Sequence, residues 1–186
     1  MDYNQFWKLI DEAREFADGW EEMYDPLVET LSKLSDEEIM RWGQIFSLYQ
    51  KLSYKDRLWA AAYVINGGCS DDAFDYFRGW LTAQGKAVFL SALRDPDSLA
   101  DIEPEDGEAE FEDMLSVSTY AYFKKHNLKQ EYDRYYSERD KYPLPAEEIA
   151  AIESEIAYAE ETGLDWGSDE SLLKEIVPRL CELLEW

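Results

Sequence analysis

The chain has 186 residues, of which 46% are hydrophobic and 15% aromatic, enough apolar material for one core of ordinary domain size and more than a disordered acidic chain carries. Its 42 acidic residues outnumber its 18 basic ones, which gives a formal charge of −24. A charge of this size repels the phosphates of nucleic acids and anionic lipid surfaces, so we expect neither as a partner.

The cysteines and the hydropathy pattern favour a cytoplasmic protein. Cys69 and Cys181 are far apart and show no CxxC spacing, which indicates free thiols and neither a disulfide framework nor a zinc site. The opening residues MDYNQFWKLIDEAREF lack the basic start and apolar run of a secretory signal. The longest apolar run, 58–65, is too short to span a membrane.

Helical spacing of apolar residues begins at once. One helix face runs from Phe6 to Ala17, and Gly19 marks its end. Asp25 followed by Pro26 predicts the cap and first position of a short second helix that ends near Leu34. Ser35 and Glu38 form a capping-box pattern that predicts the start of a third helix.

Residues 54–65 predict a central helix, because their second half leaves no polar face. Asn66, Gly67 and Gly68 then end it. Ser70 is the expected N-cap of the next helix, in which Phe74, Phe77 and Leu81 form the buried stripe. Within this helix Gly79 would let a neighbour approach closely, and Gly85 suits its end.

The second half of the chain continues the helical pattern after one interruption. Residues 86–93 predict a short helix, whereas 95–113 hold ten acids, two prolines and no base, which predicts a long acidic loop, mobile at least in part. A tyrosine-rich, locally basic helical stretch follows, up to Pro143 and Pro145. Two more helices are predicted. One runs through Ile149, Ile152, Ile156 and Ala159 and is closed by Gly163. The other begins at Ser168, an expected N-cap followed by two acids as at Ser35; it buries Leu173, Ile176, Leu180 and Leu183 and is kinked or split at Pro178.

No segment shows the alternation typical of a strand. We therefore predict an all-α, single-domain multi-helix bundle of roughly eight to ten helices, with an acidic loop around residues 95–113.

Standard catalytic patterns are absent from the sequence. The single histidine, His126, rules out multi-histidine metal sites, and its two lysine neighbours indicate a solvated surface residue more than a catalytic base. The segment ending at Gly85 and Lys86 has the wrong spacing for a phosphate-binding loop, and no GxSxG motif occurs. We expect no cofactor and no metal.

The stretch 67–85 concentrates the polar and aromatic residues that suit a binding site. Asp71, Asp75 and Arg78 have the spacing of one helix face, where both carboxylates reach the guanidinium. The favoured interpretation is an ion-paired, half-exposed face that holds Arg78 against a neighbouring loop. The alternative is a polar ligand pocket at the helix N-terminus, formed by Asp71, Asp72, Asp75 and Arg78 with Tyr76 or Trp80 as a wall.

Three segments carry a family resemblance. The run LWAAAYVINGGCSDDAFDYFRGWLTAQGKAVFLSALRDPDSLAD at 58–101 resembles the core signature of the bacterial domain-of-unknown-function 4240 (DUF4240) family. FWKLIDEAR at 6–14 is similar to the opening of that family, and DESLLKEIVPRL at 169–180 to its close. One departure is Ala73, where the family pattern leads us to expect glycine. The resemblance implies a compact bacterial cytosolic protein and brings no activity with it.

Two functional hypotheses follow. The favoured one is a non-enzymatic interaction module, immunity-like or an adaptor, whose acidic surface binds a basic protein partner. The alternative is an enzyme or small-ligand or metal-binding protein that uses the Ser70–Arg78 helix start. The sequence leaves the oligomeric state open.

Overall fold

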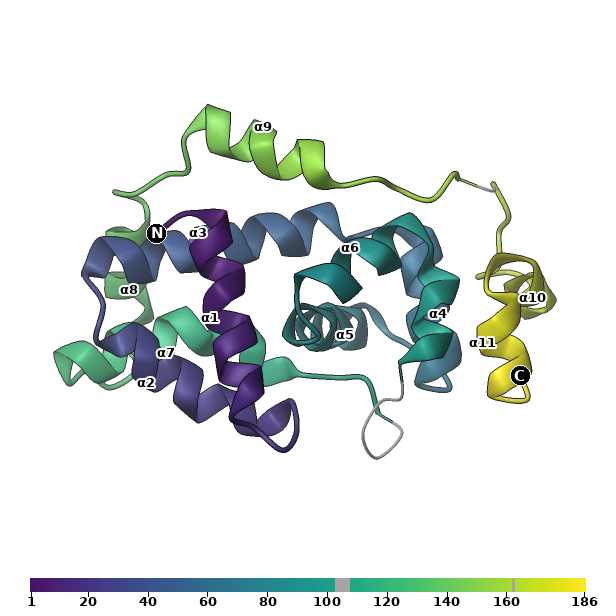
Figure 1. The fold of residues 1–186 in the computed structure, drawn as a ribbon, viewed down its shortest axis with the longest axis horizontal. Coiled ribbons are helices and arrows are strands. Elements are labelled where there is room, and N and C mark those ends of the chain that lie inside the picture. Colours follow the sequence, from purple (N-terminus) through teal and green to yellow (C-terminus); the bar gives the residue numbers. More distant parts are fainter. Residues whose placement is uncertain (103–107, 162) are drawn as a thin grey trace.

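A computed structural model describes residues 1–102, 108–161 and 163–186. These residues form helices and no strand, which confirms the all-α prediction (Figure 1). The α-helices are α1 (Tyr3–Glu15), α2 (Tyr24–Ser32), α3 (Asp36–Leu52), α4 (Asp56–Ile65), α5 (Asp71–Ala83), α6 (Lys86–Arg94), α7 (Val117–His126), α8 (Tyr132–Arg139), α9 (Ala146–Glu155), α10 (Leu173–Ile176) and α11 (Pro178–Leu183). Short 3-10 helices are η1 (Glu21–Met23), η2 (Pro96–Asp101), η4 (Glu112–Ser116) and η5 (Glu170–Leu172). Within the described residues, no helix has both the length and the apolar composition needed to cross a membrane.

Side-chain caps set several helix starts. Ser35 and Glu38 form the predicted capping box of α3, and Asp2 forms another with Gln5 at the start of α1. The prediction for Ser168 is wrong, because its hydroxyl donates to Asp165 instead and Asp169 caps the short helix η5. The polar residue that accepts the first free backbone N–H therefore lies one position later than predicted.

Helix α2 starts two residues earlier than predicted. Helix η1 continues directly into Tyr24, so Asp25 lies in the first turn and does not act as the cap. Pro26 is tolerated inside the first turn because the backbone N–H that it lacks has no intrahelical partner there.

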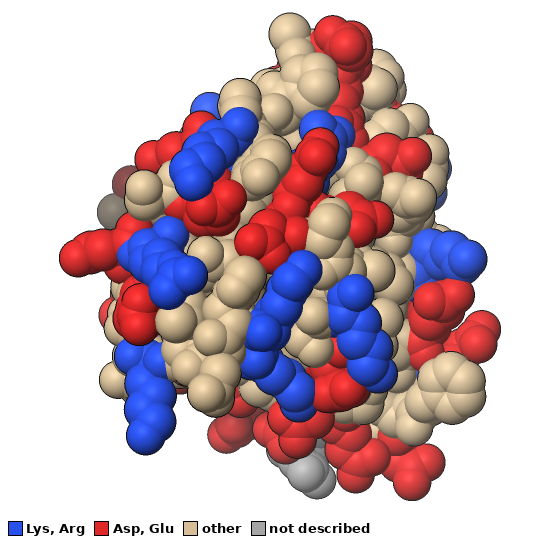
Figure 2. All heavy atoms as spheres, turned by 90° about the vertical axis from the view of Figure 1, so that its left-hand side faces the viewer, with Lys and Arg blue, Asp and Glu red and all other residues tan. Residues whose placement is uncertain are grey.

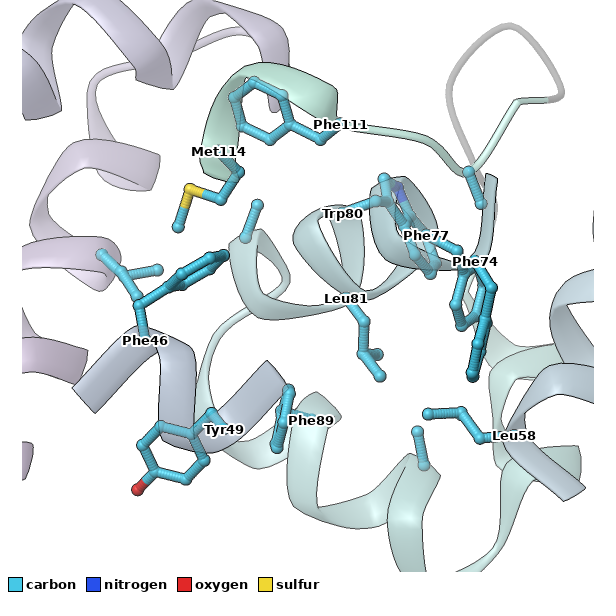
Figure 3. Close-up of a cluster of buried hydrophobic side chains, with 14 of the residues drawn as sticks. Phe46, Tyr49, Leu58, Phe74, Phe77, Trp80, Leu81, Phe89, Phe111 and Met114 are labelled. Atoms are coloured by element: carbon cyan, nitrogen blue, oxygen red, sulfur yellow. The ribbon is translucent and has the colours of Figure 1, made fainter. Parts of the chain in front are cut away.

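The core is built from aromatic rings that join the helices, as the close-up in Figure 3 shows for α3 to α6 and η4. The ring centroid of Phe6 lies 5.0 Å from that of Trp42 and 5.6 Å from that of Tyr49, which connects α1 to α3. The ring centroid of Trp7 lies 5.4 Å from that of Phe89 on α6. The buried apolar side chains form one connected cluster that runs through α1 to α7, η4, α8, α9 and the C-terminal helices.

Helix α5 has the longest unbroken run of buried residues, and α4, the predicted central helix, is buried along most of its second half. All residues from Phe77 to Ala83 are buried, including Arg78 and Thr82. Trp59 and Tyr63 leave one side of α4 partly exposed. Neighbours therefore surround α5 on every side in its second half.

The described parts of the acidic segment 95–113 contain 3-10 helices and buried residues. Residues 96–101 form η2, and Glu112 and Asp113 begin η4. Ala109 and Phe111 are buried, and the Asp97 carboxylate accepts the Arg179 and Leu180 N–H groups at 3.0 Å each, which caps α11. The part of the predicted mobile loop at 103–107 lies outside the described residues.

Residues 142–166 cross the helices as a strap between α8 and the C-terminal helices (Figure 1). Helix α9 ends at Glu155, so the prediction that it continues through Ala159 to Gly163 is wrong. Ile156 is extended, and the Ala159 N–H donates to the Leu93 carbonyl at 2.9 Å. In this part of the strap, a hydrogen bond to the body of the protein replaces a hydrogen bond within a helix.

The C-terminal helix is split at Pro178, as predicted, into α10 and α11. Leu173, Ile176 and Leu180 are buried, but Leu183 is 58% exposed, which corrects the prediction for that residue.

His126 is a partly buried hydrogen-bond partner of Asp36, whereas we predicted a solvated surface residue. Its Nε2 lies 3.0 Å from both carboxylate oxygens of Asp36, and its ring packs on Tyr122. Burial alone would raise the pKa of Asp36, but hydrogen bonds from Lys125 and His126 outweigh it and lower that pKa. The two lysine neighbours misled the prediction, because the helix turns His126 toward the start of α3.

Candidate functional site

The turn before α5 is closed by the residues that the sequence indicated. Gly67 and Gly68 have φ of +66° and +135°, and the Gly68 N–H donates to the Tyr63 carbonyl at 2.8 Å. Ser70 Oγ accepts the Ala73 N–H at 3.1 Å, which confirms it as the N-cap. Cys69 lies between them, and burial raises the pKa of its thiol to about 12, so it is a thiol at neutral pH.

Arg78 is buried and fully engaged by the protein. It pairs with Asp75, donates to the carbonyls of Gln50 and Phe74, and lies over the Tyr54 ring at 4.7 Å. Burial lowers the pKa of the guanidinium, and the charge of Asp75 opposes this shift. These contacts connect α5 to α3. The ion pair with Asp75 agrees with the predicted face, but Arg78 is buried and not half-exposed, and its partner Gln50 lies on a helix and not on a loop.

The other predicted site residues separate into different surroundings. Asp71 accepts the Tyr54 hydroxyl at 2.6 Å and does not pair with Arg78, and Asp72 is exposed. Tyr76 and Trp80 point to the far side of the helix, where they line two surface hollows that meet at Trp20. The structure thus pairs Asp75 with Arg78, links Asp71 to Arg78 through Tyr54, and places Tyr76 and Trp80 at the two hollows. A ligand role for the set stays a prediction.

The hollow beside Tyr76 is the better-formed candidate site. It has a volume of about 390 Å³, and we call it the acidic hollow. Three aromatic residues and four carboxylates line it: Trp20, Tyr76 and Phe111, with Glu21, Glu110, Glu112 and Asp113.

Close backbone packing places the acidic segment against α5. The Phe111 N–H donates to the Tyr76 carbonyl at 3.0 Å, and a Cβ on Gly79 would lie only 2.5 Å from the Phe111 carbonyl oxygen. Ala109 exchanges two hydrogen bonds with the side chain of Asn66 at the end of α4. Only glycine at 79 leaves room for this approach, and the approach places Glu110 and Glu112 beside Tyr76.

The charge of the hollow is uncompensated. No lysine or arginine of the described residues pairs with Glu21, Glu110, Glu112 or Asp113. Burial raises the pKa of Glu110, and the negative charge of Glu112 is the main cause that raises the pKa of Tyr76. The Tyr76 shift reports local negative charge that a bound cation would relieve, whereas the Glu110 shift reports a carboxylate in a partly buried position.

Aromatic walls with carboxylates are the surroundings that organic cations favour, because the ring faces and the carboxylates both attract positive charge. The Trp20 and Phe111 rings pack at 5.0 Å, which holds one wall in place. Within the part of the chain that the structure describes, no three His, Cys, Asp or Glu residues converge as a metal site. The arrangement suits a lysine or arginine side chain or another amine.

Sequence reasoning found Tyr76 and the acidic segment but did not bring them together. Trp20 and Glu21 gave no signal, since they follow the end of α1 in an ordinary connection. Gly79 was the one signal in the sequence for this contact. It predicted that a neighbour packs closely against α5, but it could not identify that neighbour as Phe111.

A family model described as a protein of unknown function (DUF4240) matches residues 1–124, about two thirds of the chain. The chain belongs to the DUF4240 family. The resemblance at 6–14 and 58–101 lies inside the match, whereas the DUF4240-like close at 169–180 lies beyond it and stays a prediction. No curated protein and no solved structure matched the chain. In this DUF4240 member, the matched region contains α1 to α6 and most of α7. It also contains every residue of the acidic hollow.

Proposed function

We propose that this DUF4240 protein is a non-enzymatic binding module for a basic protein partner, and that the acidic hollow receives a lysine or arginine side chain of that partner. The observation that carries the proposal is the combination of three aromatic walls with four carboxylates that lack a basic partner among the described residues. A cation in this hollow gains both ring-face attraction and charge pairing.

The charge of the whole protein supports the same proposal. A formal charge of −24 attracts a basic protein over distances beyond direct contact and speeds the encounter. An immunity protein that restrains a basic toxin, or an adaptor, has this chemistry. Two free cysteines, one buried and one half-buried, support a cytoplasmic setting.

The alternative site at Ser70–Arg78 has less support from the contacts. Arg78 and Asp71 already have protein partners, so a ligand there would have to replace hydrogen bonds that join α5 to α3 and to Tyr54. We therefore place the proposed site on the Tyr76 side of α5.

The test uses a labelled lysine-rich peptide and the same peptide with every lysine acetylated. We expect the lysine peptide to bind the full chain, to shift the NMR signal of the Trp20 indole N–H, and to weaken at least fivefold between 50 and 200 mM NaCl. Acetylation removes the positive charge and should abolish the effect.

Matched variants localise the binding. Trp20→Ala and Glu112→Gln are expected to weaken it about tenfold and threefold, while Glu182→Gln, at an exposed position of α11, leaves it within twofold. Equal loss in Glu182→Gln, or tight binding of the acetylated peptide, would contradict the proposal.

A further inference from the structure

A second concave surface, of about 560 Å³, lies between α2 and the end of α7. Its apolar lining consists of Tyr24, Val28, Tyr120, Phe123 and Leu128. Asp25, Lys124, Lys129 and Gln130 complete it. We call it the tyrosine groove; it is distinct from the acidic hollow, with which it shares no residue.

The aromatic side of the groove is exposed yet held in place by ring packing. Tyr120 is 36% exposed, and its ring packs edge-on against Phe123 and Tyr24. Tyr132, 40% exposed, extends this wall at 5.3 Å from Phe123. Rings fixed in this way lose little conformational entropy when a ligand covers them, and tyrosine is enriched in protein interfaces for this reason.

A tight turn after α7 positions the other side. Asn127 adopts a left-handed conformation with φ of +51°, and the Leu128 N–H donates to the Phe123 carbonyl at 2.9 Å. The turn folds Leu128 against the groove and brings Lys129 to its edge, so the apolar lining and the positive charge are built by the same backbone geometry.

The local charge is opposite to that of the whole protein. Residues 124–141 hold six bases and four acids in a chain with 18 bases and 42 acids, and Lys and Arg side chains gather on this end of the molecule (Figure 2). Lys124 shares Glu29 with Lys33, whereas Lys129 has no ion-pair partner among the described residues. Asp25 is the carboxylate in the lining, and Glu29 is shared by two lysines, so Lys33, Lys124 and Lys129 together exceed these two carboxylates by one positive charge.

We propose that the tyrosine groove binds an acidic peptide segment of a partner protein, with a large aliphatic or aromatic side chain packed on Tyr120 and Phe123 and flanking carboxylates paired with Lys124 and Lys129. The charge complementarity selects this occupant: a basic segment would meet two lysines here and is better accommodated by the acidic hollow. The inference does not depend on the proposed function, because no residue is shared.

The experiment selects binders from a displayed library of random twelve-residue peptides on the full chain and measures each by fluorescence anisotropy. We expect the selected peptides to share Asp or Glu on both sides of a large apolar residue. Their Kd should rise at least tenfold in Lys129→Glu and in Tyr120→Ala, with circular dichroism confirming that both variants fold.

Lys174→Glu is the matched control, because it makes the same charge change at an exposed position of α10, at the far end from α7 and α8 in Figure 1. We expect less than a twofold change in that variant. A library that yields no acidic–apolar consensus, or an equal loss in Lys174→Glu, would overturn the proposal. Self-association that Lys129→Glu abolishes would overturn it too, since a second copy would then be the occupant.

Discussion

Gly79 is the residue on which the geometry of the acidic hollow depends most directly. A methyl group at this position would meet the Phe111 carbonyl oxygen at 2.5 Å and the Leu115 side chain at 3.0 Å. Backbone cannot yield as a flexible side chain does, so the segment that carries Glu110 and Glu112 would have to move away from α5.

We therefore predict that Gly79→Ala destabilises the protein by about 1–3 kcal/mol. The added methyl group would overpack the contact and strain the hydrogen bond between Phe111 and Tyr76, and these losses outweigh the gain of roughly 1 kcal/mol in helix propensity. Urea unfolding followed by circular dichroism measures this change. Gly167→Ala is the control, since its Cβ would only approach Asp165 at 3.8 Å and should change stability by less than about 0.5 kcal/mol. Equal effects at the two positions would contradict the close approach.

Glu110 gives a pH-dependent prediction. Burial raises the pKa of its carboxyl group, helped by the charge of Glu108, so the folded protein holds this proton more tightly than the unfolded chain does. Ionisation therefore lowers stability as the pH rises from the ordinary carboxyl pKa through the raised one.

The neutral variant Glu110→Gln should for this reason be more stable than the parent at pH 7 and equally stable near pH 3.5. The gain at pH 7 should be less than about 1 kcal/mol, because the Glu110 side chain is only half-buried. Urea titrations at both pH values measure the difference, with exposed Glu182→Gln as the reference. A less stable Glu110→Gln at pH 7 would show that the carboxylate has a favourable partner in the folded protein.

At the scale of elements, α9 is the helix most weakly attached to the rest. Ile152 is its only fully buried residue, and its other links are the ion pairs Arg41–Glu148 and Lys86–Glu155. In contrast, α5 buries an unbroken run from Phe77 to Ala83. Few buried contacts mean that α9 opens locally at a lower free energy than α5.

Hydrogen exchange measured by mass spectrometry should show this order. We expect the amides of α9 to exchange at least a hundredfold faster than those of α5, and Arg41→Ala to accelerate α9 further without changing α5. Uniform protection of both helices would contradict the weak attachment.

Local side-chain chemistry predicted the starts of α3 and α5. Ser35 and Ser70 supply caps that work from a few adjacent residues, so the sequence alone was sufficient for α3 and α5. The end of α9 was wrong because Ile156 and Ala159 keep the apolar spacing of a helix, while the bond from Ala159 to Leu93 favours an extended chain. That bond joins segments that are far apart in sequence.

The candidate site shows the same division. Tyr76 and the acidic segment were each noticed from the sequence, but their contact with Trp20 arises only when η1, α5 and η4 pack together. Spacing along one helix cannot predict such a contact. The pairing of Arg78 with Asp75, at i and i+3, was predicted because it is local.

At the scale of the whole molecule, most of the charge is repulsive. Forty-two acids against 18 bases leave many carboxylates without a basic neighbour, and their mutual repulsion opposes the compact state. Salt screens this repulsion over a distance of about 10 Å at 0.1 M.

We predict that the melting temperature rises by roughly 3–6 °C between 20 and 300 mM NaCl at pH 7, which corresponds to about 1–2 kcal/mol for a chain of this size. Scanning calorimetry measures it. Near pH 4.5 many carboxylates are protonated, so the rise should be smaller there. A melting temperature that falls with salt would mean that attractive ion pairs dominate.

The cap that Asp97 places on α11 has a practical consequence for the boundary of the DUF4240 match. Tyr135, Ile152 and Leu180, all beyond residue 124, are buried in the same core as the matched helices. Cutting the polypeptide at that boundary would strip the cover from α3 and α4 and leave the Asp97 carboxylate without the two amides that it accepts. The folded unit is therefore larger than residues 1–124, the region by which the family is recognised. Mutagenesis and crystallisation should use the longer chain.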